Sequence, residues 1–182
     1  MKTRKCRIHR VIFIIVILSF TLLSFESFAE DWPQWRGLER NGISNETNLL
    51  KSWPEGGPAL LWSKEGIGTG FASISISNDV IYITGEKNDD ELITAMDLNG
   101  NIKWQNIYGT YWEDSYSDAR STPTVDGDQL YVISGKGELV CIERSSGKIK
   151  WSVDTIEKFD GDYHHWGIAE SPLVVDNKVI CT

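Results

Sequence analysis

The sequence contains few cysteines, three among its 182 residues, and no two of them are adjacent. Outside the first 29 residues only Cys141 and Cys181 remain, in the strand-like runs LVCIE and KVICT. So few thiols exclude a disulfide-stapled miniprotein and a cysteine-rich metal site. Each of the two cysteines stands where a small apolar residue would serve, so we expect buried free thiols. A disulfide is the alternative, which an oxidising compartment would permit.

The chain after residue 29 also has little positive charge and no long helical pattern. It carries 13 Lys/Arg against 25 Asp/Glu, a net charge of −12. Such an acidic body repels nucleic acid and anionic lipid surfaces, so we expect neither as a partner. No stretch after residue 30 keeps a helical period beyond about two turns, which indicates an all-β protein.

Residues 1–29 hold what the rest lacks, a cluster of basic residues and an uninterrupted apolar run. Five Lys/Arg precede the apolar stretch 11–23, and Ser27 and Ala29 are small residues at −3 and −1 of a cut before Glu30. These three parts are typical of a secretory signal peptide. An uncleaved anchor is the alternative, although the apolar run is shorter than the roughly 20 residues that span a bilayer. We expect an exported protein, periplasmic or at the cell surface, with no membrane span in the mature chain.

From residue 71 onward the sequence repeats with a period of 49. Three equivalent stretches begin at Ser73, Thr122 and Ser171 (SISI, TPTV and SPLV). Each leads into a β-branched run, and in the first two repeats an apolar run, a Gly-containing turn and a Trp follow. Turn residues such as Asn99 and Gly100 tolerate positive φ and favour hairpins. Each unit therefore predicts four short strands.

Four strands at a spacing of roughly 40–50 residues are typical of a β-propeller blade. One blade cannot bury both of its faces, and stacking the blades around an axis buries them against each other. We predict an all-β propeller of four-stranded antiparallel blades, with Ser73, Thr122 and Ser171 entering successive inner strands. Residues 71–182 hold two complete repeats and the start of a third, an incomplete arc of about two to three blades. Since a closed propeller needs at least about four blades, we expect these repeats to be truncated at the C-terminus.

Residues 30–70 show no sustained period, and we interpret them as an irregular N-terminal segment that ends in one closing strand around Trp62. Trp104 and Trp151 mark the same closing strand in the two complete repeats. A large ring on the outermost strand can pack over the neighbouring blade. We therefore interpret all three tryptophans as structural rather than as ligand contacts.

Residues 141–151 (CIERSSGKIKW) resemble the tryptophan-docking motif of the pyrroloquinoline-quinone (PQQ)-like propellers. Residues 95–104 (AMDLNGNIKW) are similar but one residue shorter before the glycine, and residues 31–37 (DWPQWRG) resemble the start of exported bacterial members. The resemblance covers nearly all of residues 31–182 and implies a PQQ-like propeller. That family includes eight-bladed quinoprotein alcohol dehydrogenases, which hold PQQ beside calcium. It also includes cofactor-free scaffolds, such as the lipoprotein of the outer-membrane β-barrel assembly machine, so the fold does not decide the function.

Two loops, residues 105–121 and 152–170, run from the outermost strand of one repeat to the innermost strand of the next. We expect them on one face, converging on the mouth of the propeller, where ligands and partners commonly bind. The binding residues that we expect there are aromatic side chains for stacking and polar side chains for hydrogen bonds: Tyr111, Trp112, Trp166, Arg120, His165 and Glu170. The alternative is that these loops tuck their own aromatic side chains onto the rim.

The run 160–166 (DGDYHHW) combines Asp and His, both of which can bind metals. A metal or catalytic loop is one interpretation, and an ordinary polar loop is the other. Adjacent histidines usually point in different directions, so we assign no catalytic residue and no metal ligand.

For function, the sequence favours an exported binding or scaffold module without a cofactor. Its partner would be a protein, or a small-molecule or carbohydrate ligand, held at the mouth. The alternative implied by the resemblance is a quinoprotein dehydrogenase of alcohols or polyols, with PQQ and calcium held by blades that this sequence does not include. The dehydrogenases carry a vicinal Cys-Cys pair, which this sequence lacks.

Overall fold

The computed structural model describes residues 30–182, so the predicted signal peptide lies outside the described part of the chain. The first four-stranded sheet follows the sequence order without a crossover. Its strands are β1 (Ser75–Ser77), β2 (Val80–Lys87), β3 (Asp90–Asp97) and β4 (Ile102–Thr110). Asn78 and Asp79, and again Asn88 and Asp89, have positive φ in the two-residue turns that join β1 to β2 and β2 to β3. This conformation fits the right-handed twist of a tight antiparallel hairpin.

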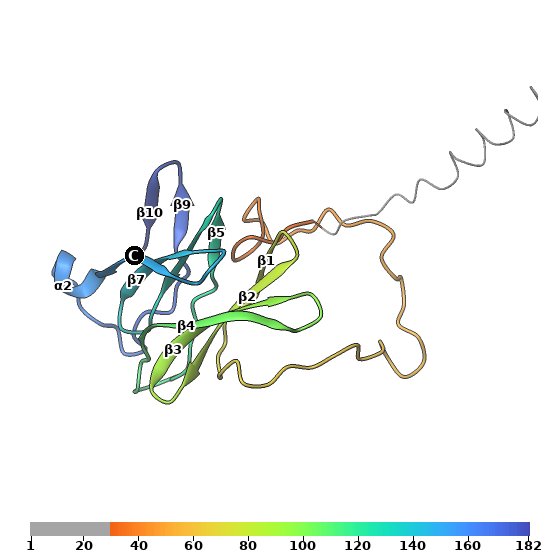
Figure 1. The fold of residues 1–182 in the computed structure, drawn as a ribbon, viewed down its shortest axis with the longest axis horizontal. Coiled ribbons are helices and arrows are strands. Elements are labelled where there is room, and N and C mark those ends of the chain that lie inside the picture. The colour runs from red at the N-terminus through yellow and green to blue at the C-terminus, as the bar shows by residue number, and fades with distance from the viewer. Residues whose placement is uncertain (1–29) are drawn as a thin grey trace, which may run out of the picture.

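The second sheet repeats the first, and the third repeat contributes one hairpin (Figure 1). The second sheet contains β5 (Thr124–Asp126), β6 (Gln129–Ile133), β7 (Glu138–Glu143) and β8 (Ile149–Asp154). The hairpin contains β9 (Leu173–Val175) and β10 (Lys178–Ile180). The one helix among the described residues is α2 (Thr155–Phe159), a single turn capped by Asp154. The predicted incomplete arc of antiparallel four-stranded blades is confirmed.

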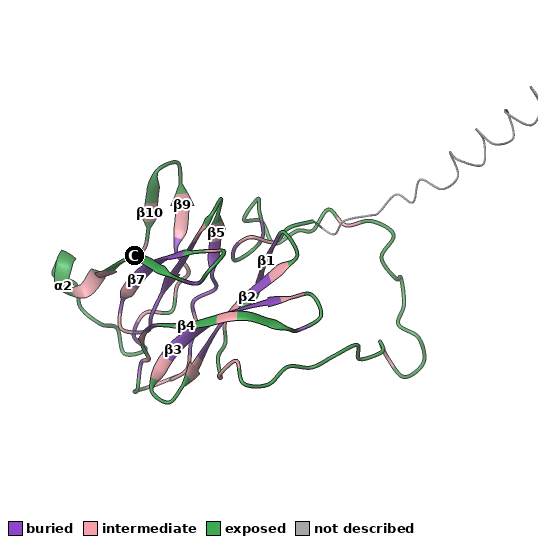
Figure 2. Ribbon diagram, in the orientation of Figure 1, coloured by how far each residue is buried: buried purple, intermediate pink, exposed green. Residues whose placement is uncertain are grey.

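The main hydrophobic core lies between the two complete blades and draws residues from both. Tyr82, Ile93 and Tyr108 from the first blade form one cluster with Leu130 and Val140 from the second. Figure 2 shows this burial along the middle strands, while the outer strands and the N-terminal segment are largely exposed. Face-to-face stacking therefore buries the surfaces that a single blade would leave open.

The inner strands are linked by hydrogen bonds that recur at equivalent positions. The Ser73 backbone N–H donates to Thr122 Oγ1 at 3.1 Å, and the Thr122 N–H donates to Ser171 Oγ at 2.9 Å. Ser75 Oγ donates to the Pro123 carbonyl, and Thr124 Oγ1 donates to the Pro172 carbonyl. The predicted start of each inner strand is thus close to correct, since each strand begins two residues later.

Trp104 docks one blade onto the next. Its indole Nε1 donates to the Arg144 carbonyl at 3.1 Å, and its ring lies so close to Gly147 that a Cβ there would approach within 2.6 Å. The αL conformation of Gly147, with φ of 75°, adds a second reason for glycine at this turn. Trp104 therefore contacts the neighbouring blade through both its ring and its indole N–H.

Trp62 makes the corresponding contact with the first blade but lies in no strand, contrary to the expected closing strand. Its Nε1 donates to the Leu98 carbonyl at 2.9 Å, and its ring covers Gly100. No other described strand pairs with the backbone around Trp62, so the docking contact is kept without the strand.

Trp151 on β8 is equivalent to Trp104 in register, because Trp104 pairs with Ala95 and Trp151 pairs with Cys141, each beside a β-bulge. Its ring lies 6.0 Å from Tyr131, yet the side chain is 38% exposed. Both cysteines of the described residues are free, as expected, with Cys141 buried and Cys181 half-buried.

The N-terminal segment crosses the inner strands of all three repeats. Trp32 and Ile76 exchange two backbone hydrogen bonds of 2.9 Å, and the Val125 N–H donates to the Pro33 carbonyl at 2.8 Å. Arg40 Nη2 then donates to the Val174 carbonyl at 2.7 Å. The three contacted positions, 76, 125 and 174, are spaced by 49 residues, so the segment binds the same site of each repeat.

Beyond residue 42 this segment swings away from the sheets as a largely exposed loop (Figure 1). It returns first where Trp62 docks onto the turn between β3 and β4, and then where Thr69 bridges to Glu86 on β2. Within residues 30–182, no helix is both long enough and apolar enough to cross a membrane.

Candidate functional site

The two loops between blades pack against each other into one surface. We call residues 111–119 and 159–168 the connector surface. Ser115 Oγ donates to the His165 carbonyl at 2.6 Å, and the rings of Trp112 and Tyr163 lie 5.2 Å apart. Glu113 forms a salt bridge of 2.9 Å with Lys136, in the turn between β6 and β7. The loops are therefore fixed to each other and to the second blade.

Among the aromatic residues predicted at the mouth, Trp112 holds the loops together. It is 9% exposed, and a Cβ at Gly167 would come within 2.6 Å of its ring. Its Nε1 is buried and has no hydrogen-bond partner among residues 30–182. Trp112 thus follows the alternative in which a loop tucks its own aromatic side chain inward.

Trp166 is placed differently, since 47% of its surface is exposed. It stacks on His164 at 5.5 Å and meets His165 edge-on at 6.2 Å. An exposed ring held by neighbouring rings, as that of Trp166 is, can contact a partner at little cost in side-chain entropy.

Tyr111 is half-buried beside Asp89. Burial, and after it the negative charge of Asp89, raises the pKa of the Tyr111 hydroxyl.

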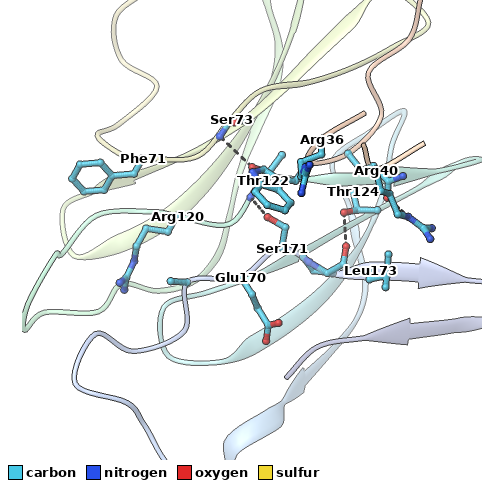
Figure 3. Close-up of a pocket in the computed structure, with 14 residues that line it drawn as sticks. Arg36, Arg40, Phe71, Ser73, Arg120, Thr122, Thr124, Glu170, Ser171 and Leu173 are labelled. Carbon is cyan, nitrogen blue, oxygen red and sulfur yellow. Dashed lines mark hydrogen bonds between the residues drawn. The ribbon is translucent and has the colours of Figure 1, made fainter. Parts of the chain in front are cut away.

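The other two predicted residues, Arg120 and Glu170, line a separate cavity of about 620 Å³, which we call the inner-strand pocket (Figure 3). The starts of all three inner strands form its wall, through Ser73, Thr122 and Ser171. The six predicted residues therefore divide between two places: Tyr111, Trp112, His165 and Trp166 belong to the connector surface, and Arg120 and Glu170 to the pocket.

Arg36 and Arg40 also line the inner-strand pocket, where the N-terminal segment places them (Figure 3). Neither was among the residues predicted from the sequence. The guanidinium of Arg36 lies 5.5 Å from the Trp35 ring centre and donates to the Asn41 carbonyl at 3.2 Å. The sequence feature that pointed to this segment is the run 31–37, which resembles the start of a PQQ-like propeller. The run has no repeat period, so it could not show that Arg36 and Arg40 lie over the pocket.

A buried polar network lies beneath the connector surface. Glu91 on β3 is 1% exposed, accepts a hydrogen bond from the Tyr108 hydroxyl, and accepts another from the Gly135 N–H at 2.7 Å. Burial raises the pKa of Glu91 to about 7, although these hydrogen bonds and the nearby Arg120 charge act in the opposite direction. Arg120 Nε and Nη2 are buried without hydrogen-bond partners among residues 30–182.

The Asp and His side chains of the run 160–166 do not gather into a cluster. In the part of the chain that the structure describes, no group of three or more His, Cys, Asp or Glu side chains is placed to hold a metal ion.

Four-stranded blades stacked in sequence order, docked by tryptophans and sharing a pocket at their inner strands, define the class of the protein: it is an arc of a β-propeller. The family described as "Outer membrane protein assembly factor BamB" matches residues 89–182. The chain belongs to this family of PQQ-like propeller repeats, as the docking motifs predicted.

Two solved structures show the same fold. A europium-containing methanol dehydrogenase superposes with a TM-score of 0.56 at 16% identity, over 88% of this chain and 28% of that one. A quinohemoprotein alcohol dehydrogenase from Comamonas testosteroni gives a TM-score of 0.58 at 18% identity, over 82% of this chain and 22% of that one. The chain thus spans less than a third of either protein. No curated protein sequence matches it significantly.

Proposed function

We propose that the chain is part of an exported PQQ-like propeller that binds a partner or ligand and does not catalyse a reaction. Residues 1–29 would direct export, residues 30–70 would brace the arc, and residues 71–182 would form the repeats. Binding would use the connector surface and the inner-strand pocket, with Tyr111, Trp112, Arg120, His165, Trp166 and Glu170 contributing either contacts or support.

The joined connector loops are the observation that supports this proposal most strongly. Loops fixed on a rigid scaffold are common sites of recognition, because the scaffold keeps their geometry constant. Here Ser115 and His165 join loops from successive blades, and Trp166 remains exposed on the resulting surface. The matched family is described as an assembly factor, which is consistent with a role in binding proteins.

We expect that the full-length protein, supplied with PQQ and calcium, does not oxidise alcohols or polyols. The measurement is reduction of an artificial electron-accepting dye with a panel of both substrate types, with and without each addition. Turnover that requires both PQQ and calcium would replace the binding proposal with a quinoprotein dehydrogenase.

We expect Trp166→Ala to weaken partner binding at least about tenfold while leaving the fold intact, because exposed aromatic anchors often dominate an interface and surface truncations rarely destabilise. The matched control is Trp53→Ala, which removes a 68% exposed tryptophan in the N-terminal segment. Cell-envelope proteins that the wild type and Trp53→Ala retain would be identified, and their affinities for all three proteins measured. Equal affinities for Trp166→Ala and the wild type would show that the connector surface is not the binding site.

A further inference from the structure

The inner-strand pocket gathers positive charge in an otherwise acidic chain. Three arginines, Arg36, Arg40 and Arg120, line it together with a single carboxylate, Glu170. Residues 30–182 carry a net charge of −12, yet within them none of these arginines forms a salt bridge. Guanidinium groups left without a carboxylate partner among so many acids favour an anion from outside the chain.

The pocket separates its charges into two sides. Figure 3 shows Arg36 and Arg40 on the side of Thr122 and Thr124, while Arg120 and Glu170 extend away from them. The Glu170 carboxylate accepts hydrogen bonds from the Thr182 N–H at 2.6 Å and from its hydroxyl at 2.9 Å. The carboxylate of the pocket is therefore engaged elsewhere, and the side that holds Arg36 and Arg40 keeps its positive charge.

Hydroxyl groups line the same side. Thr122 Oγ1 and Ser171 Oγ each accept a backbone N–H, and neither donates a hydrogen bond within residues 30–182. Arg36 uses one terminal nitrogen for the Asn41 carbonyl, and Arg40 uses one for the Val174 carbonyl. Both guanidinium groups and both hydroxyls thus retain N–H or O–H groups for a ligand oxygen.

The pocket lining also includes apolar groups. Phe71, Ala169, Pro172 and Leu173 contribute to it, and Phe71 is 68% exposed. A compact inorganic anion would leave these groups facing water, whereas a ligand with an apolar body would cover them.

We infer that the inner-strand pocket binds a small organic carboxylate. The carboxylate lies between Arg36 and Arg40 and the hydroxyls of Thr122 and Ser171, and its apolar body covers Pro172 and Leu173. The planar fork of a guanidinium matches the two oxygens of a carboxylate. This inference rests on the proposed binding function and adds a ligand class to it.

The test uses the full-length protein and three probes: benzoate, its neutral counterpart benzamide, and inorganic phosphate. Binding is followed by ligand-observed NMR and titration calorimetry without PQQ. Benzoate is expected to bind, and benzamide and phosphate to bind at least about tenfold more weakly, because each lacks one of the two required features. Equal binding of benzamide or of phosphate would overturn the inference.

Variants locate the site. Arg36→Gln and Arg40→Gln are each expected to weaken benzoate binding about tenfold, as loss of a charge-assisted hydrogen bond predicts. Lys150→Gln removes an exposed positive charge from β8 and should leave benzoate binding unchanged. Arg40 also donates a hydrogen bond to the Val174 carbonyl, so its replacement could disturb the N-terminal segment. Arg36→Gln leaves that hydrogen bond in place and is therefore the variant that decides the test. Unchanged benzoate binding in Arg36→Gln would contradict the inference, whereas PQQ-dependent turnover would contradict the proposed function separately.

Discussion

Replacing Trp104 by alanine is expected to lower the free energy of unfolding by about 3–5 kcal/mol, the usual loss for a large aromatic side chain removed from a packed site. Its ring fills the space above Gly147 and lies 6.1 Å from Tyr82 in the core. Its indole also donates the hydrogen bond to the Arg144 carbonyl, which would lose this partner in the alanine variant. The substitution therefore removes packing and a polar contact between two blades together.

The measurement is urea unfolding of the full-length protein, with Trp53→Ala as the control for removing an exposed tryptophan. Trp104→Phe is expected to fall between the wild type and Trp104→Ala, because it keeps part of the ring and loses the indole N–H. A loss below about 1 kcal/mol for Trp104→Ala would place Trp104 outside the blade-to-blade contact, since even modest truncations of packed side chains usually exceed that value.

Glu91→Gln is expected to remove much of the pH dependence of stability between pH 4.5 and about 7, the range that separates the ordinary and the raised pKa of Glu91. The folded protein holds this proton more tightly than the unfolded chain does. The contribution of this proton to the free energy of unfolding is fully present below pH 4.5 and is lost as the pH rises through about 7. At about 1.4 kcal/mol per pKa unit, the loss is on the order of 3 kcal/mol.

Glutamine cannot ionise, so Glu91→Gln should come close to the wild type in stability below pH 4.5 and exceed it near pH 8. The charged and titratable groups around Glu91 are Tyr108 on β4, Glu138 on β7, and Arg120. Urea unfolding at several pH values tests the prediction, with Glu157→Gln as the control for an exposed carboxyl group. If Glu91→Gln keeps the pH dependence of the wild type, Glu91 does not carry this proton.

The blades could be predicted because their information is local. β-Branched runs and turn residues such as Asn99 and Gly100 indicate the strands and turns of each repeat from short stretches of chain. The 49-residue spacing then aligned Ser73 with Thr122 and Ser171, and the structure joins these three residues by hydrogen bonds. The same alignment predicted that Trp104 lies on the outermost strand of the first blade, and it lies on β4.

The details of the candidate site could not be predicted, because they depend on what covers each residue. Trp112 and Trp166 lie in similar aromatic loops, yet one is buried against Gly167 and the other is exposed. Glu91 begins an ordinary strand pattern, and only the packing around Tyr108 and Gly135 shows that its carboxyl is enclosed. Arg36 and Arg40 reach the pocket through backbone contacts of the N-terminal segment, which no periodicity reveals.

The N-terminal segment also sets an order of events during folding. Its contacts begin with Ile76 and end with Val174, 134 residues away from Arg40. Contacts between such distant residues require closure of a long chain loop, so they form slowly and late. The first residues after the predicted cleavage site are synthesised before any repeat exists. Trp32 and Pro33 can be fixed once the first two inner strands have formed, whereas the contact of Arg40 has to wait for the third. In a nascent or proteolysed chain that lacks the third repeat, the part of this segment around Arg40 would lose its contact, and cleavage of the chain near Arg40 by a protease would report whether the third inner strand is in place.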